Sequence, residues 1–96
     1  MPFDNVSKTR VLGRASTFFE EYETTSLYVF RPFGKILDMI TLSNDSDTDT
    51  IHASYDGATL AGIIKAGETI TLGTEDKIGV YIRGIVGGDN VRIWGW

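Results

Sequence analysis

Residues 51–64 read IHASYDGATLAGII, two short apolar segments on either side of an Asp-Gly pair. The first segment alternates, with His52 and Ser54 predicted to face outward, which is the period of a strand with one buried face. Asp56 and Gly57 are a typical central pair of a type I′ turn, in which both residues have positive φ. These residues therefore predict a β-hairpin and indicate an all-β chain.

Strand patterns recur along the rest of the chain, separated by Gly, Asp and Asn. Strands are expected at 27–33, 35–43, 51–55, 58–64, 68–72, 77–86 and 91–96, with one more within 6–14. Seven or eight short antiparallel strands predict a single small β-sandwich, with the jelly roll as one arrangement. A small β-barrel is the alternative, and the pattern does not separate the two.

The N-terminal part of the chain is less regular than the rest. Residues 27–96 are predicted to form the β-sandwich domain, and residues 1–26 an N-terminal arm or irregular lead-in. Within the lead-in, the sequence at 18–23 predicts at most one helical turn. An arm that docks on a neighbouring molecule and a frayed terminus both fit such a segment.

Length and charge narrow the class of protein. A chain of 96 residues without Cys forms one domain with a small core, and such cores are often stabilised by oligomerisation. The net charge is −4 and no Lys/Arg cluster is present, so nucleic acid is not an expected partner. No apolar run is long enough for a membrane span. The first ten residues lack the apolar core of a signal peptide, so synthesis in the cytoplasm is expected.

One alternation has the residue types of a hydrolase triad. His52, Ser54 and Asp56 fall on the same parity of a predicted strand. Neighbouring side chains on one strand project in parallel and do not converge on a common atom. Ordinary polar residues beside a turn explain them better, and we expect no enzyme activity.

The acidic loop at 44–50 is a candidate metal site. Asp45, Asp47, Asp49 and Asp56 have nearly the spacing of the ligands in an EF-hand loop. Thr50, however, stands where the turn glycine belongs, and a strand follows instead of a helix. Calcium binding is one interpretation, and a polar loop with turn-stabilising side chains is the other. We expect no cofactor, with Ca²⁺ as the alternative.

Aromatic and arginine side chains collect in the last two predicted strands. If these strands pair through the turn at 87–90, their outward residues share one surface, to which the lead-in can add phenylalanines. The candidate protein interface comprises Phe3, Phe18, Phe19, Tyr81, Arg83, Arg92, Trp94 and Trp96. Trp, Tyr and Arg are enriched in interface hot spots. Burial of these rings against the N-terminal segment, or stacking on sugar rings, are the alternatives.

Residues 40–96 carry a pattern of turns and strand ends. The pieces are Asn44-Asp45, Ser54-Tyr55-Asp56-Gly57, Gly67-Glu68, Tyr81-Ile82-Arg83 and Val91-Arg92-Ile93-Trp94. The pattern resembles small all-β structural proteins of bacteriophage virions, of the capsid decoration or head-stabilising type. The resemblance implies a multi-copy, particle-bound protein that contacts capsid or other virion proteins, without catalytic residues.

These observations predict a non-enzymatic structural or assembly protein. The first expectation is a capsid decoration protein or other virion subunit, located in the virion and forming a homo-oligomer, with a trimer favoured. The alternatives are a carbohydrate-binding β-sandwich module, with Trp94 and Trp96 as its platform, and a small cytosolic adaptor that binds one protein partner.

Overall fold

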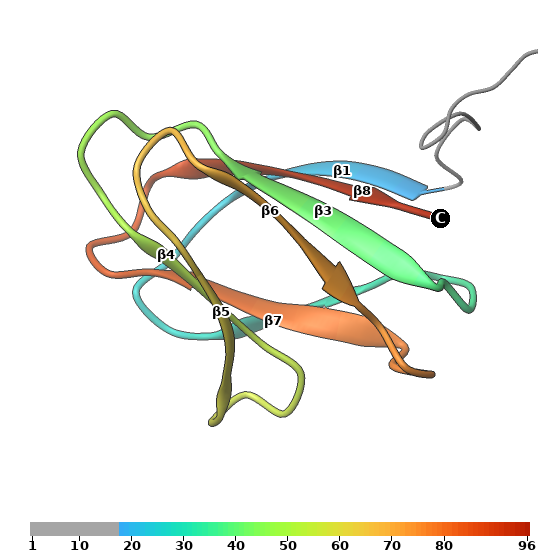
Figure 1. Cartoon of the computed structure of the whole chain (residues 1–96). Helices are drawn as coiled ribbons and strands as arrows, with labels where there is room; N and C mark the ends of the chain where they lie inside the picture. The colour runs from blue at the N-terminus through green and yellow to red at the C-terminus, as the bar shows by residue number, and fades with distance from the viewer. Residues whose placement is uncertain (1–17) are drawn as a thin grey trace, which may run out of the picture.

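Eight antiparallel strands form two four-stranded sheets within residues 18–96, the part of the chain that the computed structural model describes (Figure 1). The strands are β1 (Phe18–Glu23), β2 (Val29–Pro32), β3 (Met39–Asn44), β4 (Ile51–Ser54), β5 (Leu60–Ile64), β6 (Thr69–Gly73), β7 (Gly79–Gly84) and β8 (Asn90–Gly95). This arrangement confirms the predicted all-β sandwich. None of the described residues belongs to a helix that is long and apolar enough to cross a membrane.

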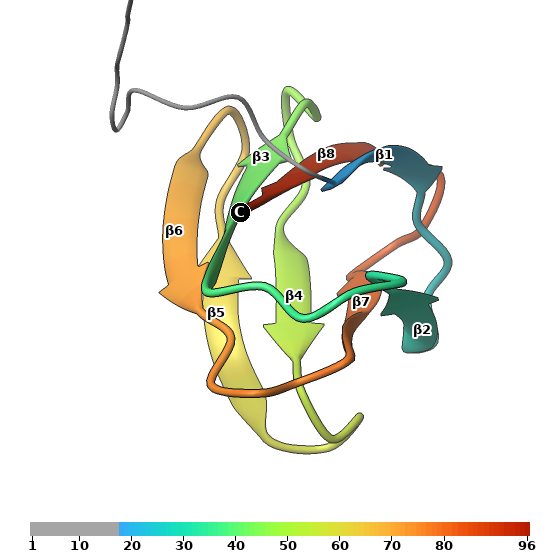
Figure 2. The ribbon, with the colours of Figure 1, turned by 90° about the vertical axis from the view of Figure 1, so that its right-hand side faces the viewer.

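The strand pairing is nested. Strand β1 pairs with β8, β2 with β7, β3 with β6 and β4 with β5, each antiparallel. Two further ladders, β3 with β8 and β4 with β7, complete the sheet orders β1-β8-β3-β6 and β2-β7-β4-β5. A long two-stranded ribbon that wraps into two sheets pairs in this way, which is the jelly roll arrangement. Figure 2 shows β1 and β8 in one layer above β2 and β7 in the other.

The core lies between the two sheets and follows the alternation of the strands. Val91 and Ile93 of β8, and Val80 and Ile82 of β7, are fully buried, as the sequence predicts. The other buried apolar residues are Phe33, Leu37, Ile40, Leu42, Ile51, Ala53 and Ile64. One face of each sheet is therefore committed to the core, and the opposite face is left for solvent or for partners.

Strand β1 corrects the prediction for the N-terminal segment. Residues 18–23 form an edge strand instead of a helical turn, and they pair with β8 along its whole length. This part of the predicted lead-in therefore belongs to the sandwich. Phe3 and the strand predicted within 6–14 lie outside the described residues.

The β4–β5 connection also differs from the prediction. The hairpin forms, but φ is positive at Gly57 and not at Asp56, so the turn is not type I′. The Asp56 carboxylate instead accepts the backbone N–H of Thr59 at 2.7 Å and shapes a longer loop. The register shift in the β4–β5 ladder skips Ala61 on β5, while the β4–β7 ladder is unbroken and keeps Ser54 on the same side as His52. Ser54 is nevertheless fully buried, because the β4–β5 loop lies against it and the N–H of Gly57 donates to its hydroxyl at 3.0 Å.

A tight turn connects β6 to β7. Glu75 and Asp76 both have positive φ, 46° and 69°, and the N–H of Lys77 donates to the carbonyl of Thr74 at 2.8 Å. Ile78 follows this turn before β7 begins and is 70% exposed. The prediction that Ile78 faces inward is therefore wrong, because the strand starts at Gly79, two residues later than predicted.

Candidate protein interface

An aromatic pair lies on the outer face of the β1-β8-β3-β6 sheet. Phe19 on β1 and Trp94 on β8 are ladder partners, and their ring centroids are 5.5 Å apart. Arg92, two residues before Trp94, places its guanidinium 5.1 Å from the centre of the indole ring. Phe19 is 53% exposed. We call these three residues the aromatic face, which exists because alternate residues of β1 and β8 point away from the core.

An ion pair fixes the arginine of the aromatic face. Arg92 donates from Nε to one Asp45 carboxylate oxygen at 2.8 Å and from Nη2 to the other at 3.0 Å. This two-pronged geometry is the preferred match of a guanidinium with a carboxylate. The bonds to Asp45 raise the pKa of Arg92. The pair holds the guanidinium over Trp94 and neutralises its charge there.

Hydroxyl groups continue this surface across β3 and β6. Thr41 is the ladder partner of Trp94, and its hydroxyl lies 3.0 Å from that of Thr71 on the next strand. One step along, the hydroxyl of Thr69 donates to that of Ser43 at 3.1 Å. The outer face of this sheet is therefore aromatic and charged on the β1–β8 half, where Glu21 and Glu23 are exposed beside Phe19, and uncharged and polar on the β3–β6 half.

The predicted interface does not form one surface. Tyr81 and Arg83 belong to β7, which lies in the opposite sheet from β8, so they cannot join Trp94. The chain between the two strands, residues 85–89, crosses from one sheet to the other and is not a hairpin turn. The prediction that β7 and β8 pair is wrong because their partners in the ribbon are β2 and β1.

Tyr81 and Arg83 belong to a second surface, on the outer side of the β2-β7-β4-β5 sheet. The ring centroid of Tyr81 lies 5.0 Å from that of Phe30. The guanidinium of Arg83 lies 5.4 Å from the ring centre of Tyr28. Its Nε is buried and has no hydrogen-bond partner within the described part of the chain. This second surface is aromatic and cationic, and no carboxylate forms a salt bridge with Arg83 within residues 18–96.

The three residues of the formal triad have separate structural roles. His52 is the ladder partner of Arg83 on the second surface, and burial, aided by the charge of Arg83, lowers the pKa of the imidazole. The Ser54 hydroxyl donates to Asp56 at 2.9 Å and accepts the N–H of Gly57 at 3.0 Å. Ser54 and Asp56 are therefore engaged in shaping the β4–β5 loop.

The remaining predicted interface residues are less accessible than Phe19. Phe18 packs against Phe33 with ring centroids 5.6 Å apart and lies at the core. Trp96 follows β8, is half-buried and exchanges backbone hydrogen bonds with Met39. The alternation of residues 18–23, FFEEYE, is the signal that could have placed Phe19 outward and Phe18 inward.

The acidic loop does not bring its four predicted ligands together. Asp45 is held by Arg92, and Asp56 follows β4 while the other three precede it. Asp49 lies close to Asp89 at the start of β8, where burial, and next the Asp49 charge, raise the pKa of the Asp89 carboxyl. In residues 18–96 no group of three or more His, Cys, Asp or Glu side chains is placed to hold a metal ion.

Two comparisons with known proteins, one with family models and one with curated sequences, were made for this chain. No protein-family model matches the chain, and no curated protein matches it. The functional argument therefore depends on the surfaces of the sandwich and on the residues that build them.

Proposed function

We propose that the protein is a non-enzymatic assembly protein, which binds a neighbouring protein surface through the aromatic face. The class that the sequence pattern suggests is a virion subunit, such as a capsid decoration protein. Jelly rolls occur in viral capsid domains and in lectins, and the fold alone does not choose between such functions. The choice of a protein partner comes from the geometry of Phe19, Trp94 and Arg92.

The exposed contact between Phe19 and Trp94 carries this proposal. Trp and Arg are enriched among the residues that dominate binding energy at protein interfaces. Here Trp94 and Arg92 both stand on β8, Phe19 stands on the paired strand β1, and Arg92 is already fixed by Asp45 at 2.8 Å. Little side-chain entropy is then lost on binding, which lowers the cost of association.

The same geometry argues against a sugar platform at Trp94. Arg92 lies over the indole ring, and Phe19 packs against it with a 52° angle between the ring planes. A pyranose that stacks on tryptophan needs a free, flat ring face. The three side chains instead form a ridged patch, which fits the side chains of a protein partner better.

The mechanism of such a protein is burial of surface. Docking removes the rings of Phe19 and Trp94 from water, and each Å² of apolar surface that is buried contributes about 25 cal/mol. A protein that binds only the assembled form of a particle stabilises that form by mass action. We propose that the neighbouring surface is first a second copy of the chain, in a closed homo-oligomer, with a trimer favoured, whose copies contact one another through the aromatic face.

Light scattering of the purified protein at several concentrations tests this proposal. We expect a closed oligomer for the natural sequence and a shift towards monomer for Phe19→Ser, because Phe19 is half-exposed and its loss removes contact area without opening the core. The matched control is Ile78→Ser, an apolar residue that is 70% exposed and lies off the aromatic face. A protein that stays monomeric, or an oligomer that Phe19→Ser leaves intact, would contradict self-assembly through this face.

A further inference from the structure

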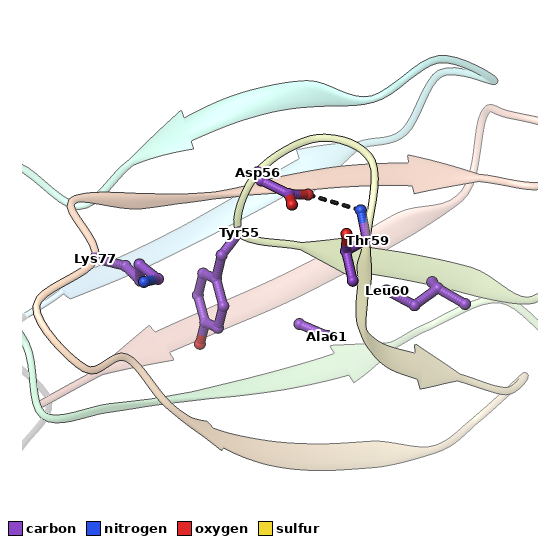
Figure 3. Close-up of a pocket in the computed structure, with 6 residues that line it drawn as sticks. All are labelled: Tyr55, Asp56, Thr59, Leu60, Ala61 and Lys77. Carbon is purple, nitrogen blue, oxygen red and sulfur yellow. Dashed lines mark hydrogen bonds between the residues drawn. The ribbon is translucent and has the colours of Figure 1, made fainter.

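A pocket opens between the β4–β5 loop and the β6–β7 turn (Figure 3). Its volume is about 390 Å³, which lies at the small end of the range for sites of small molecules, about 300–1,000 Å³. Its lining residues are Tyr55, Asp56, Thr59, Leu60, Ala61 and Lys77. The pocket thus combines an aromatic ring, two apolar side chains, a hydroxyl, a carboxylate and an ammonium.

The ring of Tyr55 is held in place from its far end. Its hydroxyl donates to the carbonyl of Gly73, at the end of β6, at 2.7 Å. In Figure 3 the ring extends from the loop into the space between Lys77 and Ala61. A ring fixed in this way is a preformed wall, and its hydroxyl is already used by the protein.

Asp56 is fixed as an anion at the rim of the pocket. One of its carboxylate oxygens accepts the N–H groups of Thr59 at 2.7 Å and Ala58 at 2.8 Å, and the Ser54 hydroxyl at 2.9 Å. These bonds, the one from Thr59 first, lower the pKa of the Asp56 carboxyl. The carboxylate is therefore a fixed hydrogen-bond acceptor.

Lys77 brings the opposite charge from the facing turn. It is exposed, and within residues 18–96 no carboxylate lies within salt-bridge distance of its ammonium. Asp56 and Lys77 line the same pocket without pairing to each other. The lining therefore has no net charge, but it offers a separate acceptor and a separate donor. It does not attract phosphate or any other ligand that carries charge of one sign.

From this lining we infer that the pocket binds one ring of a neutral carbohydrate. A pyranose has an apolar C–H face, which matches the Tyr55 ring and the Ala61 methyl group that points toward it (Figure 3). Its hydroxyl edge matches the acceptor Asp56 and the donor Lys77. This site is independent of the aromatic face, and it gives the sandwich a glycan contact at a place other than Trp94.

Nuclear magnetic resonance tests the inference with named sugars. Methyl glucoside, methyl mannoside, methyl galactoside and N-acetylglucosamine are each titrated into the ¹⁵N-labelled protein. We expect saturable amide shifts at residues 56–61 and at Lys77 for at least one sugar. A small ligand in a half-open pocket should give a Kd on the order of 1–10 mM.

Two variants locate the site without disturbing the core. Lys77→Met should weaken binding about tenfold, because a hydrogen bond to a charged group is worth at least that factor. Ala61→Leu should abolish binding by filling the pocket. Lys65→Met is the matched control, an exposed lysine in the β5–β6 turn, and it should bind like the natural protein. None of the three should change the mass found by light scattering, which separates this test from that of the aromatic face.

Three outcomes would overturn the inference. In the first, none of the four sugars produces saturable shifts. In the second, the shifts map to Phe19 and Trp94 and survive Ala61→Leu. In the third, free glycine binds at the pocket while the sugars do not, which would show that Asp56 and Lys77 recognise a zwitterion.

Discussion

Arg31 on β2 donates two hydrogen bonds to the carboxylate of Glu20 on β1, and this pair joins the two sheets at one edge of the sandwich. The bond from Nε to Oε1 of the carboxylate is 3.1 Å long, and Nη2 donates to Oε2. The guanidinium also lies 4.6 Å from the ring centre of Tyr22. The hydrogen bonds that Arg31 donates to Glu20 raise the pKa of Arg31. At this edge each partly buried charge is therefore stabilised by the other, which replaces part of the water that it loses.

Replacing Arg31 with Met should destabilise the fold. The cost should be about 1–2 kcal/mol, below the 3–5 kcal/mol of a fully buried pair, because the two side chains keep 29% and 22% of their surface exposed. Urea unfolding measures it. The double variant Glu20→Gln/Arg31→Met should cost less than the sum of the two single changes, since the partner charge is removed as well. Additive costs would show that the two groups do not stabilise each other.

Alternation along single strands could be read from the sequence, whereas strand partners could not. Val91 and Ile93 are predicted inward and are buried, because period-two alternation is a local property. The pairing of β8 with β1 joins residues more than sixty positions apart, such as Phe19 and Trp94. Such pairing is set by how the ribbon wraps, and the short chain between β7 and β8 suggested a hairpin instead.

Asn44 organises the acidic loop from inside, and its removal should be costly. Its side-chain amide donates to the carbonyls of Asp49 at 2.8 Å and Ile64 at 2.9 Å, and its oxygen accepts the N–H of Ser46 at 2.9 Å. Asn44→Ala leaves these groups without partners and should lower the free energy of unfolding by about 2–4 kcal/mol.

Asn90→Ala is the control for this change, because Asn90 is exposed at the start of β8. It should alter the free energy of unfolding by no more than about 0.5 kcal/mol. Equal effects of the two changes in urea unfolding would show that the buried amide of Asn44 is not what holds the loop.

Asp89 should destabilise the protein at neutral pH. Burial, and then the charge of Asp49, raise the pKa of Asp89 above its ordinary 3.8 in the folded state. The folded protein therefore binds this proton more tightly than the unfolded chain, and its stability falls as pH rises through the raised pKa. Asp89→Asn should raise the free energy of unfolding at pH 7, and the gain should fade as pH drops below 3.8.

Thermal unfolding at several pH values checks this prediction. Asp47→Asn is the control, because Asp47 is an exposed carboxylate of the acidic loop that also contains Asp49, and its removal should leave the stability nearly unchanged. A loss of stability in Asp89→Asn at pH 7 would mean that hydrogen bonds to the carboxylate outweigh its burial.

In the candidate sites too, features within one strand could be predicted from the sequence, whereas contacts between distant segments could not. The residue types of the aromatic face were evident, and Trp94 and Arg92 do share one side of β8. The pocket could not be predicted, because Tyr55 and Lys77 come from two loops that the fold brings together. Ser54 is buried on its outward side because the β4–β5 loop, whose path the alternation does not reveal, lies against its hydroxyl.

Ile93 and Trp94 are neighbours on β8, and comparing their removal tests which side of that strand is the core. Ile93 is fully buried, so Ile93→Ala should lower the free energy of unfolding by about 2–5 kcal/mol. Trp94 is only half-buried, against Phe19 and Arg92. Trp94→Ala should therefore cost less than Ile93→Ala although it removes the larger side chain, and the protein should keep its β-type circular dichroism.

Changes at Trp94 and at Ile93 should affect assembly in the opposite way from stability, with the larger effect at Trp94. If Trp94 serves the aromatic face, Trp94→Ala should shift the mass found by light scattering towards monomer while the chain stays folded. Ile93→Val, a milder change in the core that typically costs about 0.5–1.5 kcal/mol, should leave that mass unchanged. Global unfolding of Trp94→Ala would instead place the indole in the structural core, and the aromatic face would then lose its strongest anchor for a partner.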